Sequence, residues 1–134
     1  MATEYEYGPS FKKIMSDLSK NTNDVAYEFA EILNKSPEDI FNVNIDKKLD
    51  DLRRVLNTED IYFAAEEGND KLVDPCLMTG FYLHKVASNM QKFAEDWYAS
   101  LASRVIDKQE IRQFIYDIRD LSLFAGKCAA KYKD

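Results

Sequence analysis

Three side chains of this sequence have the reactivity that covalent catalysis needs: the single histidine, His84, and the two cysteines, Cys76 and Cys128. A cysteine beside a histidine is the smallest arrangement that activates a thiol as a nucleophile. If the last two helices form a hairpin that turns near Ile106, Cys128 lies level with Lys85 and therefore near His84. No third group that could orient the histidine is identifiable, and Cys128 belongs to an apolar stripe. We therefore favour an inert core thiol over a nucleophile.

The same hairpin geometry argues against a disulfide bond between the two cysteines. Counted from Ile106, Cys76 and Cys128 end about 12 Å apart along the hairpin, which is beyond the reach of a bridge. A bend of the first helix near Gly80 would weaken this estimate. We therefore expect two free, buried thiols that act as small hydrophobic side chains.

Metal and cofactor chemistry lacks the residues that it needs. The sequence has neither a CxxC nor an HxxxH motif for zinc. A di-iron site in a helical bundle needs ExxH motifs, but Phe81 and not a glutamate precedes His84 by three positions. Phosphate-binding glycine loops and the GxSxG motif of serine hydrolases are also missing. The sequence therefore predicts no metal, no cofactor and no catalytic residue, and favours a protein that is not an enzyme.

Two pairs of carboxylates are the remaining candidates for metal chemistry. Glu28 and Glu31 form an ExxE pattern, and Glu67 and Asp70 form an ExxD pattern. Together they resemble the paired motifs of the all-helical, magnesium-dependent nucleotide pyrophosphohydrolases of the MazG type. The resemblance covers only these residues, and in that family the second pair lies inside a helix, whereas Gly68-Asn69 should break one here. A pyrophosphohydrolase-like enzyme is therefore kept as an alternative function.

The charge of the chain is unevenly distributed. Its 134 residues include 18 basic and 24 acidic side chains, for a formal net charge of −6. The whole excess of acid lies before residue 75, and basic pairs such as Lys12-Lys13 and Arg53-Arg54 are flanked by acids. Because nucleic-acid binding needs clustered lysine and arginine, we expect no direct contact with nucleic acid. An acidic surface could instead bind a basic or mixed protein surface, or imitate DNA towards a DNA-binding protein.

The first nine residues have no helical period, which predicts an N-terminal arm over 1–9, and residues 4–7 within it alternate acidic and aromatic side chains. Aromatic rings supply rigid contact area at interfaces, and interleaved acids suit a basic, apolar groove. We therefore predict that the partner-binding residues are Glu4, Tyr5, Glu6, Tyr7, Glu66 and Glu67. The alternative is that this arm folds back on the helices.

The sequence shows no targeting or membrane-spanning segment. Residues 1–10 are acidic and aromatic, whereas a signal peptide is basic and then apolar. Charged residues interrupt every long apolar run, so no membrane insertion is expected. These features favour a soluble protein that is cytoplasmic by default, and they leave open a processed organellar or lumenal chain.

Start signals and apolar spacing predict a series of short helices in the first half of the chain. They begin at Ser10, at Asn21 or Thr22, at Ser36, at Asp46 and at Thr58. Before the fourth of these helices, Phe41, Val43 and Ile45 alternate as in an extended stretch.

The last part of the chain carries the clearest pattern. Apolar or small residues recur every three or four positions over about 75–105 and again over 108–132, as in two helices that pack along one face. An Asp107–Glu110 capping box starts the second helix. The first stripe is Cys76, Gly80, Leu83, Ala87, Met90, Ala94, Trp97 and Leu101, and the second is Ile111, Phe114, Ile118, Leu121, Ala125, Cys128 and Tyr132.

The sequence thus predicts an all-α, single-domain helical bundle over residues 1–134, built on a long C-terminal antiparallel helical hairpin with shorter N-terminal helices packed across it. Since no coherent catalytic constellation is present, the favoured function is a non-enzymatic protein-binding module. It would dock on another protein or a larger complex as an inhibitor, a regulator or a stabilising extrinsic subunit. The alternatives are an acidic DNA mimic and the pyrophosphohydrolase-like enzyme.

Overall fold

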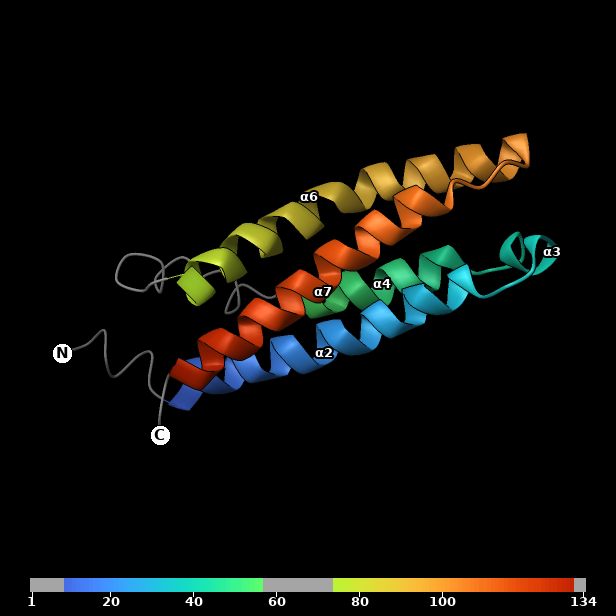
Figure 1. Ribbon diagram of the computed structural model, residues 1–134. Coiled ribbons are helices and arrows are strands. Elements are labelled where there is room, and N and C mark those ends of the chain that lie inside the picture. The colour runs from blue at the N-terminus through green and yellow to red at the C-terminus, as the bar shows by residue number, and fades with distance from the viewer. Residues whose placement is uncertain (1–8, 57–73, 132–134) are drawn as a thin grey trace.

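The computed structural model describes residues 9–56 and 74–131, and every regular element in these two ranges is a helix. In chain order they are α2 (Pro9–Leu33), α3 (Pro37–Ile40), α4 (Ile45–Leu56), α6 (Asp74–Ser103) and α7 (Lys108–Lys131) (Figure 1). The predicted all-α bundle with a C-terminal helical hairpin is confirmed. The predicted N-terminal arm, apart from Pro9, and the helix expected to begin at Thr58 lie outside the described residues.

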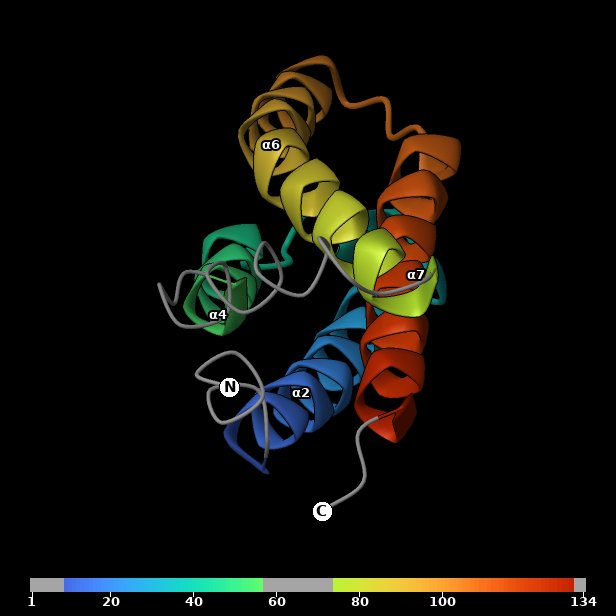
Figure 2. The ribbon, with the colours of Figure 1, turned by 90° about the vertical axis from the view of Figure 1, so that its left-hand side faces the viewer.

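The long helices run antiparallel to their neighbours around one core. In Figure 1, α2 and α6 run in one direction and α4 and α7 run in the other. α7 packs against α2 and α6, while α4 contacts α2 and α6 on the other side of the core. Figure 2 views the bundle from its end and shows the cyclic order α2, α7, α6, α4. None of the helices in the described ranges has an apolar stretch long enough to cross a membrane.

α7 contributes most to the centre of the bundle, and its predicted apolar stripe is buried from Ile111 to Cys128. Tyr132, the last member of the stripe, lies outside the described residues. Phe93 stacks on Phe114 with ring centroids 4.3 Å apart, and Phe29 meets these rings edge-on at 5.7 and 5.5 Å. α2, α6 and α7 therefore each contribute one ring to a single aromatic cluster, which stabilises their packing beyond the burial of apolar area.

Only some of the residues in the predicted apolar stripe of α6 are buried. Four of its five large or cysteine members are buried as expected, namely Cys76, Leu83, Met90 and Trp97, and Leu101 is half-buried. The small residues Gly80, Ala87 and Ala94 are only half-buried, and the core is filled instead by Thr79, Val86 and Phe93. Both sets alternate three and four positions with the large residues, so spacing alone does not distinguish them. Bulkier side chains bury more apolar area, and the helix turns these towards the core.

α2 is one continuous helix, so the predicted break at Asn21 or Thr22 is wrong. Thr22 is completely buried in the middle of α2, and its hydroxyl donates a hydrogen bond of 2.6 Å to the Leu18 carbonyl oxygen. A threonine hydroxyl can be satisfied by the preceding turn of its own helix as well as at a helix start. The tertiary contact of α2 with α7 therefore decides between two local roles for the same residue.

The start of α3 is as predicted, but the extended stretch over 41–45 is not. Ser36 caps α3 by accepting a hydrogen bond from the Asp39 main-chain nitrogen at 3.4 Å. A short turn follows, and α4 begins at Ile45 without a strand between them. The Asn44 side chain accepts from the Lys47 nitrogen at 3.2 Å and so satisfies one of the free amides of α4.

The hairpin between α6 and α7 reverses immediately after Ser103. Arg104 has a φ of 62°, in the left-handed region, and the Val105 nitrogen donates a 3.2 Å hydrogen bond back to the Ser100 carbonyl oxygen. This is the Schellman arrangement that commonly ends helices. The connection then runs back beside the end of α6 (Figure 1). Asp107 caps α7 by accepting from the Gln109 nitrogen at 2.9 Å, in agreement with the predicted start.

Candidate functional site

A disulfide bond joins Cys76, in the first turn of α6, to Cys128, in the last turn of α7. The two Cα atoms lie 4.8 Å apart, and both side chains are buried. The prediction of two free thiols is therefore wrong, although both cysteines lie in the core as expected. The bond fixes the open end of the hairpin, opposite the turn at Arg104.

The position of the turn explains why a bridge is possible. The chain reverses next to Ser103 and not near Ile106, because the Schellman turn sends the connection back beside α6. Moving the turn along the chain by about three residues changes which residue of α7 faces a given residue of α6 by about six positions. Six positions correspond to roughly 9 Å along a helix. This removes most of the expected separation and brings Cys128 opposite Cys76.

His84 and Cys128 do not form a catalytic pair. The Cys128 sulfur is bonded to Cys76, so it is not a thiol nucleophile in this structure. His84 is exposed on α6, and its Nε2 atom lies 3.5 Å from the Ser88 hydroxyl oxygen. A turn at Ile106 would have placed His84 and Cys128 nearly level with each other, and the changed register separates them.

Three aromatic rings form a continuous row along the contact between α6 and α7. Phe81 meets Tyr82 edge-on with ring centroids 5.2 Å apart, and Tyr82 stacks on Phe124 at 5.7 Å with an interplanar angle of 9°. Lys85 Nζ lies 5.6 Å from the centroid of the Tyr82 ring, and Lys127 Nζ lies 5.6 Å from that of Phe124. We refer to these five side chains as the aromatic seam.

The aromatic seam is open to solvent although most of its area is apolar. Phe81 is 54% exposed, Tyr82 is half-buried against the core, and Phe124 is half-buried. Leu123, next to Phe124 in the sequence, is 51% exposed and lines the contact between α2 and α7. Large apolar side chains that gather on one face are typical of protein-binding surfaces.

The two lysines of the seam differ in their electrostatic environment. Lys85 Nζ lies 3.3 Å from Oδ1 of Asp117, a carboxylate that is buried between the helices and also accepts from Gln113. Lys127 forms no ion pair with any side chain in the described ranges. Within the described part of the chain, the seam therefore carries one lysine paired with a carboxylate and one lysine without such a pair.

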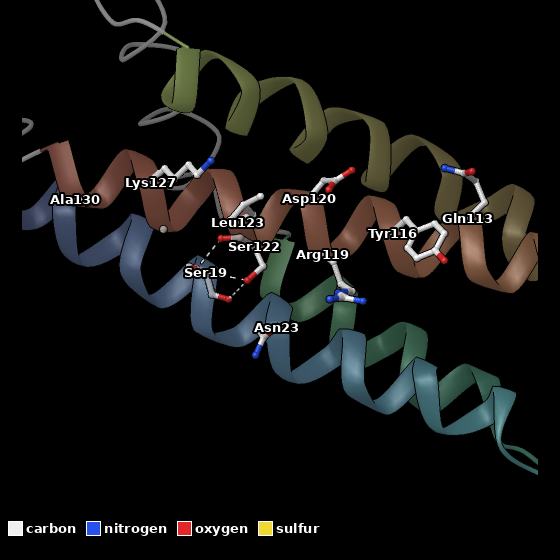
Figure 3. A pocket seen from close by; sticks show the side chains of 11 residues that line it. Ser19, Asn23, Gln113, Tyr116, Arg119, Asp120, Ser122, Leu123, Lys127 and Ala130 are labelled. Carbon is white, nitrogen blue, oxygen red and sulfur yellow. Dashed lines mark hydrogen bonds between the residues drawn. The ribbon is translucent and has the colours of Figure 1, made fainter.

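A shallow groove of about 950 Å³ follows the contact between α2 and α7. Figure 3 shows Ser19 of α2 and Ser122 of α7 joined by hydrogen bonds between the helices, with Arg119 and Asn23 nearby. Lys127 lines this groove and also belongs to the aromatic seam, so the two features share the outer face of α7. The lining combines hydroxyl, amide and charged groups without a nucleophile and base in hydrogen-bond contact.

The carboxylates with pyrophosphohydrolase-like spacing are described only in part. Glu28 and Glu31 line a groove between α2 and α4, together with lysines such as Lys35 and Lys47. In the described ranges, no three histidine, cysteine or acidic residues lie close enough together to hold a metal ion. Glu67 and Asp70 lie outside those ranges, so the predicted pairing of the two motifs stays a prediction.

Tyr98 provides the clearest electrostatic link between α4 and the hairpin. Its hydroxyl donates a hydrogen bond to the Asp46 carboxylate at the start of α4, and this hydrogen bond raises the pKa of Tyr98 above its usual value. Both side chains are exposed, and the contact positions the outer edge of α4 against α6.

The residues predicted to bind a partner all lie outside the described residues: Glu4, Tyr5, Glu6, Tyr7, Glu66 and Glu67. The aromatic seam was missed by the sequence analysis. Its one available signal was the pair Phe81-Tyr82, where two large rings lie off the apolar stripe of a helix. Phe124 carried no such signal, because only the register of the hairpin places it beside Tyr82.

Comparisons with known proteins give no relative from which a function could be inferred. The chain matches no family model, no curated protein sequence and no solved structure. The geometry of its own residues is therefore what bears on its function.

Proposed function

We propose that this protein is a non-enzymatic binding module that docks on another protein through the aromatic seam, and that it acts there as an inhibitor, a regulator or a stabilising subunit. The observation that carries this proposal is the exposed row Phe81–Tyr82–Phe124 with its two lysines. Rigid aromatic side chains are enriched where binding energy is concentrated, and the lysines set the charge of the surface.

The seam is suited to contact because it is already ordered in the unbound protein. Tyr82 is held between Phe81 and Phe124, and Lys85 is held by the buried Asp117. A partner therefore does not have to immobilise these side chains, which lowers the entropic cost of binding. The exposed half of Phe81 is the apolar surface that remains to be covered.

The charge of the seam points to an acidic and apolar partner segment. Lys127 has no ion pair within the described ranges, so a carboxylate of the partner would find an uncompensated cation beside the rings. Complementary charge sets the register of an interface and speeds encounter. The partner that fits is a protein segment in which carboxylates alternate with aromatic or aliphatic side chains.

The ring geometry favours a protein over single-stranded nucleic acid. Bases stack on free aromatic faces, but the faces of Tyr82 and Phe124 lie against each other at an angle of 9°. Lysines lie over the rings as well, at 5.6 Å from the two centroids. Ring edges and the exposed half of Phe81 remain for contact, and these suit an apolar side chain.

The acidic arm remains a second proposed contact. Glu4, Tyr5, Glu6 and Tyr7, with Glu66 and Glu67, would meet basic groups of the same partner, whose surface would then be mixed in charge. The seam and the acidic residues carry opposite charges, so charge reversal at each should affect the two contacts separately.

A dye-labelled peptide that alternates glutamate and phenylalanine tests the seam directly by fluorescence anisotropy. Phe81→Gln and Lys127→Glu should each weaken its binding about tenfold, as expected for a residue at the centre of an interface. Tyr27→Gln is the matched control, since Tyr27 is 67% exposed on α2 and makes no part of the seam. Circular dichroism should show the same helix content for all three variants.

A second peptide that alternates lysine and phenylalanine checks the sign of the charge. It should bind more weakly than the acidic peptide, and Lys127→Glu should improve its binding. Equal affinity of the wild-type protein for both peptides, or an equal effect of Tyr27→Gln and Phe81→Gln, would contradict the proposal. Tighter binding of a labelled oligothymidine than of either peptide would replace the protein partner with nucleic acid.

A further inference from the structure

The disulfide bond and the aromatic seam are carried by the same segments of the two helices. Tyr82 follows Cys76 on α6 by less than two helical turns, and Phe124 precedes Cys128 on α7 by about one turn. The stacking of Tyr82 on Phe124 therefore depends on how the bridged end of α6 lies against α7.

The buried side chains described at the bridged end of α6 are smaller than those in the rest of the helix. Among the side chains whose burial is described there, Cys76 and Thr79 are buried and small, Met78 is half-buried, and the first that is both large and fully buried is Leu83. The Thr79 hydroxyl donates within α6, to the Pro75 carbonyl oxygen at 2.6 Å, and so does not tie α6 to α7. Because hydrophobic stabilisation scales with buried apolar area, the covalent bond is the main connection that the described residues provide here.

The end of α7 opposite this segment also carries small side chains. Ala125 and Ala129 are its buried apolar residues on either side of Cys128. Alanine buries little apolar area, so neither residue compensates for loss of the bridge. The large rings of the core, Phe93 and Phe114, lie more than two turns away along their helices.

We infer that the Cys76–Cys128 disulfide is a condition for binding at the aromatic seam, so that a dithiol reductant switches this surface off. The inference rests on the proposed docking function and adds that the redox state of Cys76 and Cys128 controls it. With the bond broken, the first two turns of α6 open, and Phe81 and Tyr82 lose their fixed position beside Phe124. Binding then requires a partner to order these side chains again, which lowers affinity.

The chemical step is a thiol–disulfide exchange with a dithiol. One thiolate of the reductant attacks a sulfur of the bridge, breaks the S–S bond and forms a mixed disulfide. The second thiol of the reductant then displaces the remaining cysteine. The reductant leaves as a cyclic disulfide, and its two protons and two electrons reside in the thiols of Cys76 and Cys128. Both sulfurs are buried, so exchange proceeds through local opening of this end of the hairpin.

Anisotropy with the dye-labelled glutamate–phenylalanine peptide tests the inference on the full chain at 10 °C. Reduction with dithiothreitol should weaken binding about tenfold, and reoxidation should restore it. A Cys76→Ala, Cys128→Ala double variant should bind as weakly as the reduced protein and should not respond to dithiothreitol. Trp97, buried near the turn of the hairpin, reports on the distant core, and its emission should change little on reduction.

The outcomes separate this inference from the function on which it rests. If the oxidised wild-type protein does not bind the peptide, the proposed docking function fails, and this inference fails with it. If the oxidised protein binds, and the reduced protein and the double variant bind equally well, only the redox control is wrong. Loss of Trp97 burial and of most helical signal on reduction would overturn the local mechanism, because the bridge would then hold the whole bundle.

Discussion

Ser19 of α2 and Ser122 of α7 exchange hydrogen bonds across the contact of their helices. The Ser19 hydroxyl donates to the Ser122 carbonyl oxygen at 2.7 Å, and the Ser122 hydroxyl donates to the Ser19 carbonyl oxygen at 2.6 Å. Each carbonyl belongs to the middle of a helix, so these bonds form in addition to the helical ones. They bring the two backbones close and fix the register of α2 on α7.

Removing either serine hydroxyl should destabilise the bundle moderately. Ser19→Ala and Ser122→Ala should each lower the free energy of unfolding by about 1 kcal/mol, the usual net contribution of a partly buried hydrogen bond. Urea denaturation of both single variants and of the double variant measures the coupling. We expect the double variant to lose less than the sum, since either change loosens the close contact that both bonds need. Full additivity would show that the two bonds act independently.

The effect of alanine at Gly126 should depend on Ser19. A Cβ atom at Gly126 would lie 3.0 Å from the Ser19 hydroxyl oxygen and 3.8 Å from the Ser19 Cβ. Gly126→Ala should therefore be neutral or destabilising in the wild-type chain. In the Ser19→Ala background the close oxygen is gone, and the same change should stabilise the helix by up to about 1 kcal/mol. Thermal melts of the four proteins test this, and an equal effect in both backgrounds would contradict it.

Trp97 should be a main determinant of stability. It is 3% exposed, and its Nε1 atom is buried without a hydrogen-bond partner in the described ranges. Trp97→Ala should cost about 3–5 kcal/mol because it leaves a large cavity. Trp97→Phe should cost only about 1 kcal/mol, since it keeps a ring and removes the unsatisfied N–H. Chemical denaturation monitored by circular dichroism should show a larger loss of stability for Trp97→Ala than for Trp97→Phe. A solvent-exposed Trp97 would not produce this difference.

Loss of the disulfide should lower the melting temperature while leaving the protein folded at low temperature. In the chain-entropy treatment, a bridge that closes a loop of this length contributes about 4 kcal/mol by restricting the unfolded state. Calorimetry with and without dithiothreitol should therefore show a lower melting temperature for the reduced protein, by on the order of 15 °C. The Cys76→Ala, Cys128→Ala variant is the control, because its melting temperature should not depend on the reductant.

The acidic arm should contribute to the affinity for a natural partner but not to the stability of the bundle. Glu4→Lys with Glu6→Lys should weaken capture of the partner from the native source and reduce its dependence on salt, because two favourable charges are reversed. The melting temperature should stay within about a degree of the wild-type value. Phe81→Gln serves as the comparison, since it should weaken capture without changing the salt dependence. Unchanged capture by the reversed arm would remove it from the interface.

The sequence alone determined what depends on neighbours a few residues apart. The stripe from Ile111 to Cys128 predicted the buried face of α7, because residues three and four apart share one side of a helix. The Ser36 cap of α3 and the Asp107 cap of α7 were also predicted, since each side chain accepts from an amide two or three residues ahead. Local chemistry is sufficient for both kinds of feature.

Features that depend on how distant segments meet were decided by the tertiary structure. Thr22 has the residue type of a helix start, yet burial against the rest of the bundle keeps it in the middle of α2. The choice of Val86 and Phe93 over Ala87 and Ala94 as core residues depends on the space between helices, which spacing in one helix does not reveal.

The register of the hairpin is the feature in which the structure differs most from the prediction, and the proposed site depends on this register. A Schellman turn at Arg104, with a left-handed backbone at a residue that is not glycine, moves the reversal by a few residues. That shift joins Cys76 to Cys128 and stacks Tyr82 on Phe124. The composition and periodicity of the chain therefore determined an all-helical bundle. Its disulfide and its aromatic seam were set by one turn, because a small change at a turn moves every facing pair along two long helices.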